Sequence, residues 1–340
     1  MRMKPKLSIA IMAALEVSLL MSGSAVAANG ADDSSDAAVR AAEVWAFPVE
    51  QSPDPSVLHA QASESDPRKL LHVPGSTRSY TVAQLDDFLF SPPDWFPQDH
   101  PSMPQIVASG RKPAWACGSC HQPDGRGHPE SAALAGMPAA YIRGQIEAFR
   151  DGTRAGGSLR TANAMVREAR VLDDTDLQQA ATYFASLKFR PATRIVESAS
   201  VPKTHWNGFV LTPDQDGARE PLGQRIIETP ANFKLEELGD AKDGFIAWVP
   251  VGSIARGALI AAKGNGSAPA CESCHGPKLQ GVGAIPPLAG HSPTYIVREL
   301  IFFRTGERSN PEAAAMRTEV AQLGVRDMID VAAYAASRKP

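Results

Sequence analysis

The chain has 340 residues, of which 43% are apolar and 21% are charged, a composition typical of a soluble globular protein with room for about two domains. Its formal net charge is −3, whereas a nucleic-acid-binding protein is expected to be basic. Composition therefore argues against nucleic acid as a partner, without forbidding a local basic patch that docks an acidic protein.

The first 27 residues have the pattern of a signal peptide. A basic start precedes a mostly apolar run over 7–21, and the Ala-Val-Ala sequence at 25–27 fits the small-residue cleavage pattern. Glu16 interrupts the apolar run, which argues against a permanent membrane span. We expect residues 1–27 to be removed on export to the periplasm, and no later segment has the uncharged length to cross a bilayer.

An N-terminal extension over 28–100 follows the signal segment. The stretch 28–75 is rich in Ala, Ser, Asp and Pro, and we expect its early part to be a mobile tail. Thr81 and Gln84 have the spacing of a capping box, which predicts a short helix over 82–90. The extension is therefore expected to be partly disordered, with one short helix.

Two pentapeptides, Cys-Gly-Ser-Cys-His at 117–121 and Cys-Glu-Ser-Cys-His at 271–275, have the pattern of covalent haem attachment. Cysteines three residues apart lie on one side of a helical turn, so both thiols can reach the vinyl groups at one porphyrin edge. The motifs use every cysteine of the chain, namely Cys117, Cys120, Cys271 and Cys274. We therefore predict two covalently attached c-type haems, with His121 and His275 as the proximal iron ligands.

Two other chemistries share the C-x-x-C pattern: a thioredoxin-like dithiol and a four-cysteine zinc site. The dithiol alternative needs a βαβ context, and the sequence around neither motif has one. The zinc alternative needs both cysteine pairs near one metal ion and does not need a His after each pair. The sequence favours haem over both.

The region around each motif is an internal repeat. The second motif lies 154 residues after the first (271 − 117), and the same offset continues without a gap beyond the motifs. The matched positions are Leu134-Ala135-Gly136 with Leu288-Ala289-Gly290, Tyr141 with Tyr295, Phe149 with Phe303, Gly152 with Gly306, and Arg154 with Arg308. We call residues 101–190 the first copy and residues 256–340 the second copy, and each is expected to hold one haem.

Both copies have a helical pattern. After Pro138 and Pro293, which suit a first helical turn, apolar residues recur at i, i+4 and i+7, and Gly152 and Gly306 suit the end of that helix. A final helix is expected to begin near 173–176 in the first copy and to have a counterpart in the second.

Two methionines are the candidates for the second axial position of the irons. An electron-transfer haem usually has Met or His there. Of the methionines after the signal segment, only Met165 and Met316 correspond to each other in the repeat, once a three-residue deletion is allowed for. They follow their motif histidines by 44 residues (165 − 121) and 41 residues (316 − 275). With a thioether sulfur there, the iron would have no open site.

The competing axial ligands are His100, His128 and His291. We interpret His291, whose repeat partner is Met137, as a packing or surface residue near the haem edge. Three aromatic residues, Trp95, Phe96 and Trp115, either cover the first haem edge or pack the extension down, and the sequence leaves both interpretations open.

Residues 191–255 are longer than a simple connector between the copies needs to be. Short strands are predicted at 224–228 and 245–249, bounded by Pro and Gly, so a small β-rich insertion is expected. The insertion would either dock a partner or brace the two copies.

Residues 110–190 and 260–338 resemble class I c-type cytochrome domains, in the tandem arrangement of periplasmic dihaem electron-transfer cytochromes. The resemblance rests on the attachment motif, a Gly-rich turn, Leu-Ala-Gly, a helix that starts at Tyr-Ile, the distal Met and a last helix with an aromatic residue. It implies a mainly α fold of two cytochrome c-like haem domains, with the β-rich insertion between them.

The resemblance also implies a contact that orients the proximal histidine. In the family, a proline carbonyl before the Leu-Ala-Gly turn accepts a hydrogen bond from that His. Pro287 fits the position in the second copy, whereas the first copy has Ala133 there. The two haems are therefore expected to differ in potential, because such contacts tune the metal.

The sequence thus predicts an electron carrier rather than an enzyme. Electrons would enter at one exposed haem edge, cross to the other haem and leave to a second redox protein. By family analogy, a dehydrogenase or quinol-oxidising complex is the donor, and an oxidase or reductase is the acceptor. The alternatives are a dedicated cytochrome subunit of one dehydrogenase and a dihaem peroxidase, which needs an iron whose distal position can open.

Overall fold

The structure is a computed structural model that describes residues 33–48, 66–154 and 160–340. The predicted signal segment, residues 1–27, lies outside these ranges. Within them, no helix is both long enough and apolar enough to cross a membrane.

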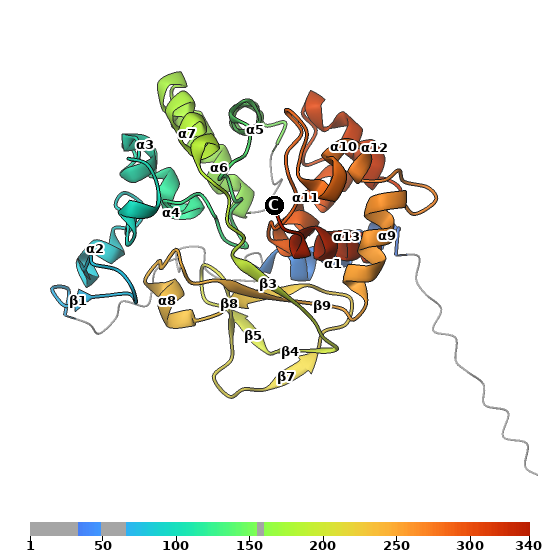
Figure 1. The fold of residues 1–340 in the computed structure, drawn as a ribbon, viewed down its shortest axis with the longest axis horizontal. Helices are drawn as coiled ribbons and strands as arrows, with labels where there is room; N and C mark the ends of the chain where they lie inside the picture. Colours follow the sequence, from blue (N-terminus) through green and yellow to red (C-terminus); the bar gives the residue numbers. More distant parts are fainter. Residues whose placement is uncertain (1–32, 49–65, 155–159) are drawn as a thin grey trace, which may run out of the picture. The chain divides into compact units, whose positions relative to one another are not determined.

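The described chain is mainly helical, and most of its strands lie between 193 and 249 (Figure 1). The helices are α1 (Asp36–Ala46), α2 (Val82–Asp86), α3 (Gln105–Ala108), α4 (Cys117–His121), α5 (Ala139–Asp151), α6 (Arg160–Val171), α7 (Asp174–Ser186), α8 (Phe233–Glu237), α9 (Ser253–Lys263), α10 (Glu272–His275), α11 (Pro293–Thr305), α12 (Ala314–Val320) and α13 (Val325–Ser337). The strands are β1 (Leu70–Leu71), β2 (Tyr80–Thr81), β3 (Thr193–Glu197), β4 (Ser200–Pro202), β5 (Thr204–Trp206), β6 (Leu211–Pro213), β7 (Arg219–Pro221), β8 (Ile227–Pro230) and β9 (Phe245–Val249).

The expectation of a mobile tail is wrong for α1. The side chain of Ser35 caps this helix by accepting a hydrogen bond from the amide of Ala38 at 3.2 Å. Val39, Ala42 and Ala46 are buried in the core that also contains α11 and α13. This apolar stripe is narrow, and its burial depends on helices that come some 250 residues later, so the local pattern alone gave no sign of it.

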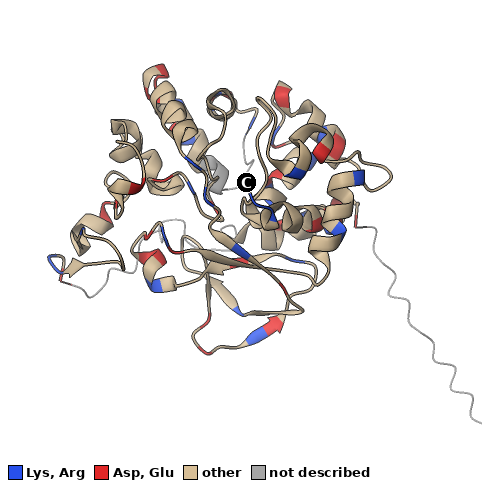
Figure 2. Cartoon of the chain, in the orientation of Figure 1, with Lys and Arg blue, Asp and Glu red and all other residues tan. Residues whose placement is uncertain are grey.

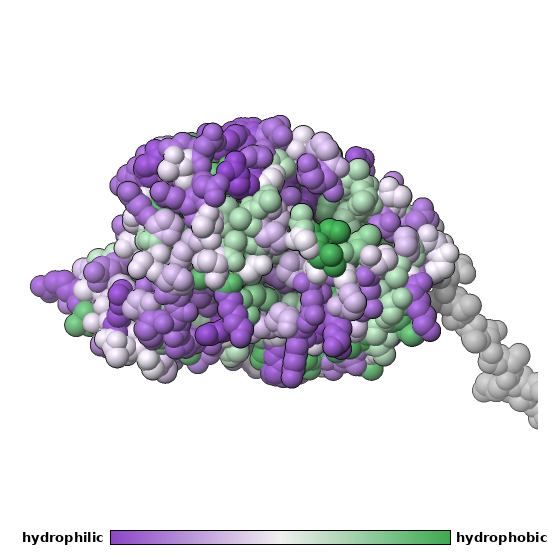
Figure 3. Space-filling model, turned by 45° about the horizontal axis from the view of Figure 1, so that its top comes forward, coloured by the Kyte–Doolittle hydropathy of each residue, from purple (hydrophilic) through white to green (hydrophobic). Residues whose placement is uncertain are grey.

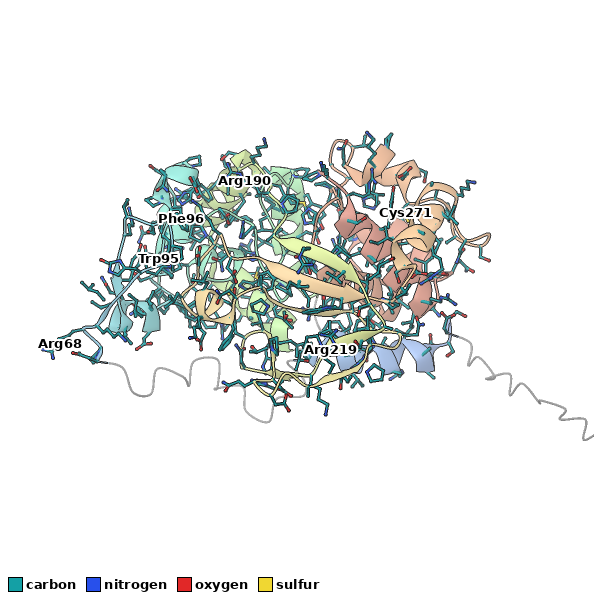
Figure 4. The ribbon with its side chains drawn as sticks, turned by 60° about the horizontal axis from the view of Figure 1, so that its bottom comes forward. Arg68, Trp95, Phe96, Arg190, Arg219 and Cys271 are labelled. Carbon is teal, nitrogen blue, oxygen red and sulfur yellow. The ribbon has the colours of Figure 1, made fainter. Side chains whose placement is uncertain are left out.

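In residues 66–100, the predicted capping box is present, but the helix that follows it is shorter than predicted. Thr81 and Gln84 cap α2 reciprocally, but the helix ends at Asp86 rather than at 90. Trp95 and Phe96 are buried against α8, and the indole nitrogen of Trp95 donates to the carbonyl of Leu238 at 2.7 Å. They therefore pack the extension onto α8, and Figure 4 shows them on the opposite side of the molecule from Cys271.

The long helices of the two copies begin and end where the repeat predicts. α5 and α11 end at Gly152 and Gly306, which have φ values of 81° and 83°. This left-handed conformation is open to glycine at little cost. The side chain of Ser292 caps α11 by accepting from the amide of Tyr295 at 3.1 Å. In the first copy α5 packs on α6 and α7, and in the second α11 packs on α12 and α13.

A small set of strands lies between the copies in the sequence. β3, β9 and β8 form a three-stranded sheet in that order, with β3 parallel and β8 antiparallel to β9. The strand predicted at 245–249 is present as β9. The one predicted at 224–228 begins later, at Ile227, where pairing with β9 starts. Two further pairs, β4 with β7 and β5 with β6, extend this region.

Candidate haem-attachment sites

The first motif forms one short helix, α4, from Cys117 to His121. Its two cysteines therefore lie three residues apart on one helical turn, as haem attachment requires. His121 is 8% exposed, and its Nδ1 lies 2.8 Å from the carbonyl oxygen of Ala132. A hydrogen bond from Nδ1 to this carbonyl leaves Nε2 as the nitrogen that can bind iron.

The second motif repeats this geometry. Cys271 has helical dihedral angles and precedes α10, which ends at His275. His275 is 7% exposed, and its Nδ1 lies 2.9 Å from the carbonyl oxygen of Pro286. In both copies the acceptor lies eleven residues after the histidine (132 − 121 and 286 − 275).

The prediction of the orienting carbonyl was wrong in two respects. The acceptor in the second copy is Pro286 rather than Pro287, and the first copy has the same contact through Ala132. The acceptor is a backbone oxygen, so the contact needs no proline at this position. The contact is present in both copies, so it gives no reason for the two irons to differ in potential.

The proximal histidines are held in the form that binds a metal. Burial lowers the pKa of both His121 and His275, and the hydrogen bond to a backbone carbonyl only partly opposes this effect. Both imidazoles are therefore neutral near pH 7, and neutral imidazole is the metal-binding form.

The four cysteines are free thiols in the described chain, with no disulfide among them. Burial raises the pKa of Cys117 to about 12 and the pKa of Cys120 and Cys271 to about 11. A redox-active dithiol shows the opposite shift, toward a low thiol pKa. Across the described ranges, no three His, Cys, Asp or Glu side chains gather as ligands for a metal ion.

These residues fit a covalently bound haem. Each motif places two unpaired thiols on one helical turn beside a buried neutral imidazole with one nitrogen left for iron. When bound, the haem supplies an iron that changes between the ferrous and ferric states. The protein's own contribution is to fix the ring of each histidine and to enclose the metal.

The loops after the two motifs have the same backbone hydrogen bonds. The amide of Gly127 donates to the carbonyl of His121 at 3.0 Å, and the amide of Gly281 donates to that of His275 at 2.8 Å. A Cβ at Gly127 would come within 2.4 Å of the carbonyl oxygen of Ser131, so the turn requires glycine there. The repeat seen in the sequence is therefore a repeat of backbone geometry at the site.

Each candidate distal methionine lies in the apolar cluster of its own motif. Met165 is on α6 and is partly buried in the cluster that contains Cys117. Met316 is on α12 and is partly buried in the cluster that contains Cys271. Met137 also lies in the first cluster and is 6% exposed. The structure thus brings each pair of predicted residues into one core, and ligation by sulfur stays a prediction.

His100 is engaged by protein groups at both ring nitrogens. Its Nε2 lies 3.1 Å from a carboxylate oxygen of Asp94, and its Nδ1 lies 3.1 Å from the hydroxyl of Tyr183. The hydrogen bond to Asp94 raises the pKa of His100. These contacts leave neither nitrogen free, so His100 is a poor candidate for an iron ligand.

His128 and His291 are buried rather than on the surface, with exposed fractions of 5% and 3%. His128 packs edge-on against Phe209, and His291 stacks on Phe189 with ring centroids 4.3 Å apart. Burial lowers the pKa of His128 to about 3 and that of His291 to about 4. Within the described chain, neither ring nitrogen of His128 has a hydrogen-bond partner, so both residues stay competitors of the methionines.

Trp115, the third aromatic residue of interest, packs against α6. The guanidinium of Arg167 lies 3.6 Å from the centre of its ring, and the backbone amide of Trp115 donates to Glu168 at 2.8 Å. It therefore packs on the helix that bears Met165 and differs in role from Trp95 and Phe96.

A buried charged network joins the two copies and was missed in the sequence. Glu299 of the second copy accepts from Arg154 at 2.7 Å and from Arg308 at 2.5 Å. Gln145 of the first copy accepts from the same two arginines, at 3.0 Å and 2.7 Å. Tyr141 and Tyr295 complete the network through their hydroxyl groups. The match of Arg154 with Arg308 in the repeat was the available signal, because an arginine kept in both copies of a small core has a structural reason to be there.

Comparison with known proteins agrees with this geometry. A family model described as Cytochrome c matches residues 107–188. Cytochrome c4 of Azotobacter vinelandii is 27% identical over 235 residues, which are 67% of this chain and 87% of that protein. Cytochrome c-554(548) of Halomonas halodenitrificans is 38% identical over 81 residues, which are 24% of this chain and 94% of that protein. The thiosulfate dehydrogenase electron acceptor of Thiomonas intermedia is 26% identical over 218 residues, which are 63% of this chain and 75% of that protein. With two attachment motifs of matching construction, the chain belongs to the dihaem c-type cytochromes of class I.

Proposed function

We propose that this chain is a periplasmic electron carrier with two haem-binding copies, 101–190 and 256–340, on either side of the strand-rich segment 191–255. The observation that carries the proposal is the shared construction of the two motifs. In each, a buried neutral histidine is oriented by a backbone carbonyl eleven residues later. Two sites built alike suit repeated one-electron transfer.

The chain's own residues have three roles in this proposal. Cys117, Cys120, Cys271 and Cys274 would hold the haem covalently through thioether bonds to its vinyl groups. His121 and His275 supply the proximal nitrogens, and the carbonyl contacts hold their rings in place. Met165 and Met316 would hold the iron through their sulfurs, which would raise its potential and leave no position open to peroxide or oxygen.

The partners follow by analogy with named relatives. One relative is called the electron acceptor of thiosulfate dehydrogenase. We therefore propose a dehydrogenase as the electron donor, with an oxidase or reductase as the acceptor. Export by the predicted signal peptide over 1–27 places the protein where covalent haem attachment occurs in bacteria.

Replacement of the two methionines tests the proposal. The oxidised wild-type protein should show the charge-transfer band of methionine-ligated ferric haem, and Met165→Ala and Met316→Ala should each remove roughly half of its intensity. Met137→Ala is the matched control, because Met137 is buried in the first cluster and has no methionine partner in the repeat. The control should keep the full band.

Two results would contradict the proposal. Persistence of the band in both variants would assign the distal positions to other groups such as His128 or His291. Alternatively, wild-type protein that consumes peroxide and shows high-spin iron would be a peroxidase.

A further inference from the structure

The two attachment motifs have the same geometry but differ in their access to solvent. Ser119 of the first motif is 4% exposed, whereas its repeat counterpart Ser273 is exposed. His128, seven residues after the first motif, is 5% exposed, whereas its counterpart Val282 is 55% exposed. The same difference holds over most of residues 123–131 compared with 277–285, the exception being Gly125 and Leu279, which are both buried, and we attribute it to what packs on the two copies.

The end of the N-terminal extension covers the first motif directly. The hydroxyl of Ser119 donates to the carbonyl of Phe88 at 2.7 Å and to that of Leu89 at 3.1 Å. The amide of Ala116 donates to the same carbonyl of Leu89 at 2.8 Å. Residues 88–107, which comprise the end of the extension and the start of the first copy with α3, thus bind the helix that carries the first pair of cysteines, and we call them the cover segment.

The second residue of each motif reflects this difference. A Cβ at Gly118 would come within 2.8 Å of the carbonyl oxygen of Val107, so the cover segment leaves no room for a side chain. The second motif has Glu272 at this position, and its side chain is partly exposed. The glycine of the first motif is therefore matched to a close backbone contact that the second motif lacks.

The loop after the first motif is covered from two further directions. Arg126 donates to the carbonyl of Asp243 at 2.7 Å, and His128 packs against Phe209, so the strand-rich segment lies over one part. Arg298 of α11 donates to the carbonyl of Pro129 at 2.7 Å and closes another part. The corresponding loop of the second copy leaves Val282 and Ile285 exposed by 55% and 38%.

We propose that the cover segment closes the first haem edge to redox partners, and that partners dock at the second motif. We call Ser273, Cys274, Lys278, Val282 and Ile285 the open face. The inference rests on the proposed function and replaces the expected passage of electrons from one end of the protein to the other. Electrons from outside both enter and leave beside Cys274, and the first haem exchanges them through the second.

The charge of the open face indicates what kind of partner fits it. Between 271 and 286 the charged residues are Glu272 and Lys278, whose charges cancel. Over the rest of the described chain, acidic and basic residues are interspersed (Figure 2). On the one face of the molecule that Figure 3 shows, strongly hydrophobic residues occur only in small patches. The occupant is therefore a redox protein with a small apolar contact face and little net charge, and its binding should depend only weakly on salt.

Hydrogen exchange in the holoprotein tests the cover without using activity. The amides of Ser119 and Ser273 have equivalent hydrogen bonds, of 3.0 Å to Ala116 and 3.1 Å to Ala270. We expect residues 117–121 to exchange about tenfold more slowly than 271–275. Gly118→Glu should remove this difference by displacing the cover segment, and the reciprocal Glu272→Gly is the matched control and should change nothing. Equal exchange of the two motifs in the wild-type protein would overturn the proposal.

Oxidation by small charged reagents tests the route. One hexacyanoferrate(III) ion is reduced to hexacyanoferrate(II) for each ferrous iron that becomes ferric, so full oxidation consumes two ions per protein. The double variant Val282→Glu and Ile285→Glu adds two negative charges about 10 Å from a reagent docked at the open face. Oxidation by this trianion should therefore slow about fivefold at roughly 0.1 M salt and about 20-fold at roughly 0.01 M. Oxidation of the same variant by tris(phenanthroline)cobalt(III), a trication, should be faster than that of the wild type.

The control double variant carries Val251→Glu and Leu259→Glu, which are 64% and 59% exposed and lie outside the open face. Its rates should stay near those of the wild type. If the first edge also exchanged electrons with the reagent, loss of the second route would slow oxidation by at most about twofold, and this result would refute the proposal. Dimer formation is also compared between the wild type and the open-face double variant. If the wild type dimerises and the Val282 and Ile285 substitutions abolish the dimer, the open face binds a second copy of the chain and the proposal is refuted. Neither the exchange rates nor the oxidation rates depend on the identity of the distal ligands. Failure of this inference can therefore be distinguished from failure of the proposed function.

Discussion

Glu299→Gln removes one negative charge from the buried network that joins the two copies. The side chain of Glu299 is 12% exposed, and those of its partners Arg154 and Arg308 are 9% and 7% exposed. Burial alone would raise the pKa of Glu299, but the two guanidinium groups lower it below its ordinary value, so the carboxylate is charged near pH 7. The substitution therefore leaves two buried positive charges facing a neutral amide.

The expected cost follows from this loss of compensation. Removing one partner of a buried ion pair costs about 3–5 kcal/mol, because the remaining charge is left without a counter-charge. The amide oxygen of glutamine still accepts from one guanidinium and restores about 1 kcal/mol. We therefore expect the free energy of unfolding to fall by about 2–4 kcal/mol.

Denaturation by urea, followed by circular dichroism of the holoprotein, measures this quantity. Glu147→Gln is the matched control, because Glu147 pairs with Arg143 on the surface of α5 at 3.5 Å, with side chains 51% and 37% exposed. That pair should contribute no more than about 0.5 kcal/mol. If the two substitutions destabilise the protein to the same small extent, the network does not hold the copies together as reasoned here.

Two further predictions concern acid stability and helix packing. Burial lowers the pKa of His128 to about 3 and that of His291 to about 4, below the ordinary value of 6.5, so the unfolded chain binds protons that the folded chain does not. Their contribution is complete above pH 6.5 and is lost as the pH falls, by about 1.4 kcal/mol per pH unit for each residue. His291→Met should reduce the measured slope of unfolding free energy against pH by that amount, and an unchanged slope would contradict the assignment. In α9, Gly257→Ala would place a Cβ within 1.9 Å of the carbonyl oxygen of Asp330 and should cost about 1–3 kcal/mol, whereas Gly144→Ala in α5 meets no atom within 4 Å and should gain about 0.5–1 kcal/mol. Thermal unfolding of the two variants should shift in opposite directions, and a shift in the same direction would show that the helix contact at Gly257 is not tight.

The sequence was sufficient wherever a few neighbouring residues decide the geometry. The two C-x-x-C-H motifs predict haem attachment because the spacing of the thiols depends on one helical turn. Gly152 and Gly306 end their helices because a left-handed residue is needed at that point. The same is true of the capping box at Thr81, which needs only its own hydroxyl and the side chain of Gln84.

Only the tertiary structure decided which parts of the chain pack together. The docking of α1, the cover over the first motif and the Arg154–Glu299–Arg308 network each join residues from distant parts of the chain. The orienting carbonyl of Ala132 was also hidden, because a backbone oxygen carries no side-chain signature. Local sequence fixes turns and helix ends, but the environment of a side chain depends on segments far away in the chain, and two nearly identical motifs can therefore differ in exposure.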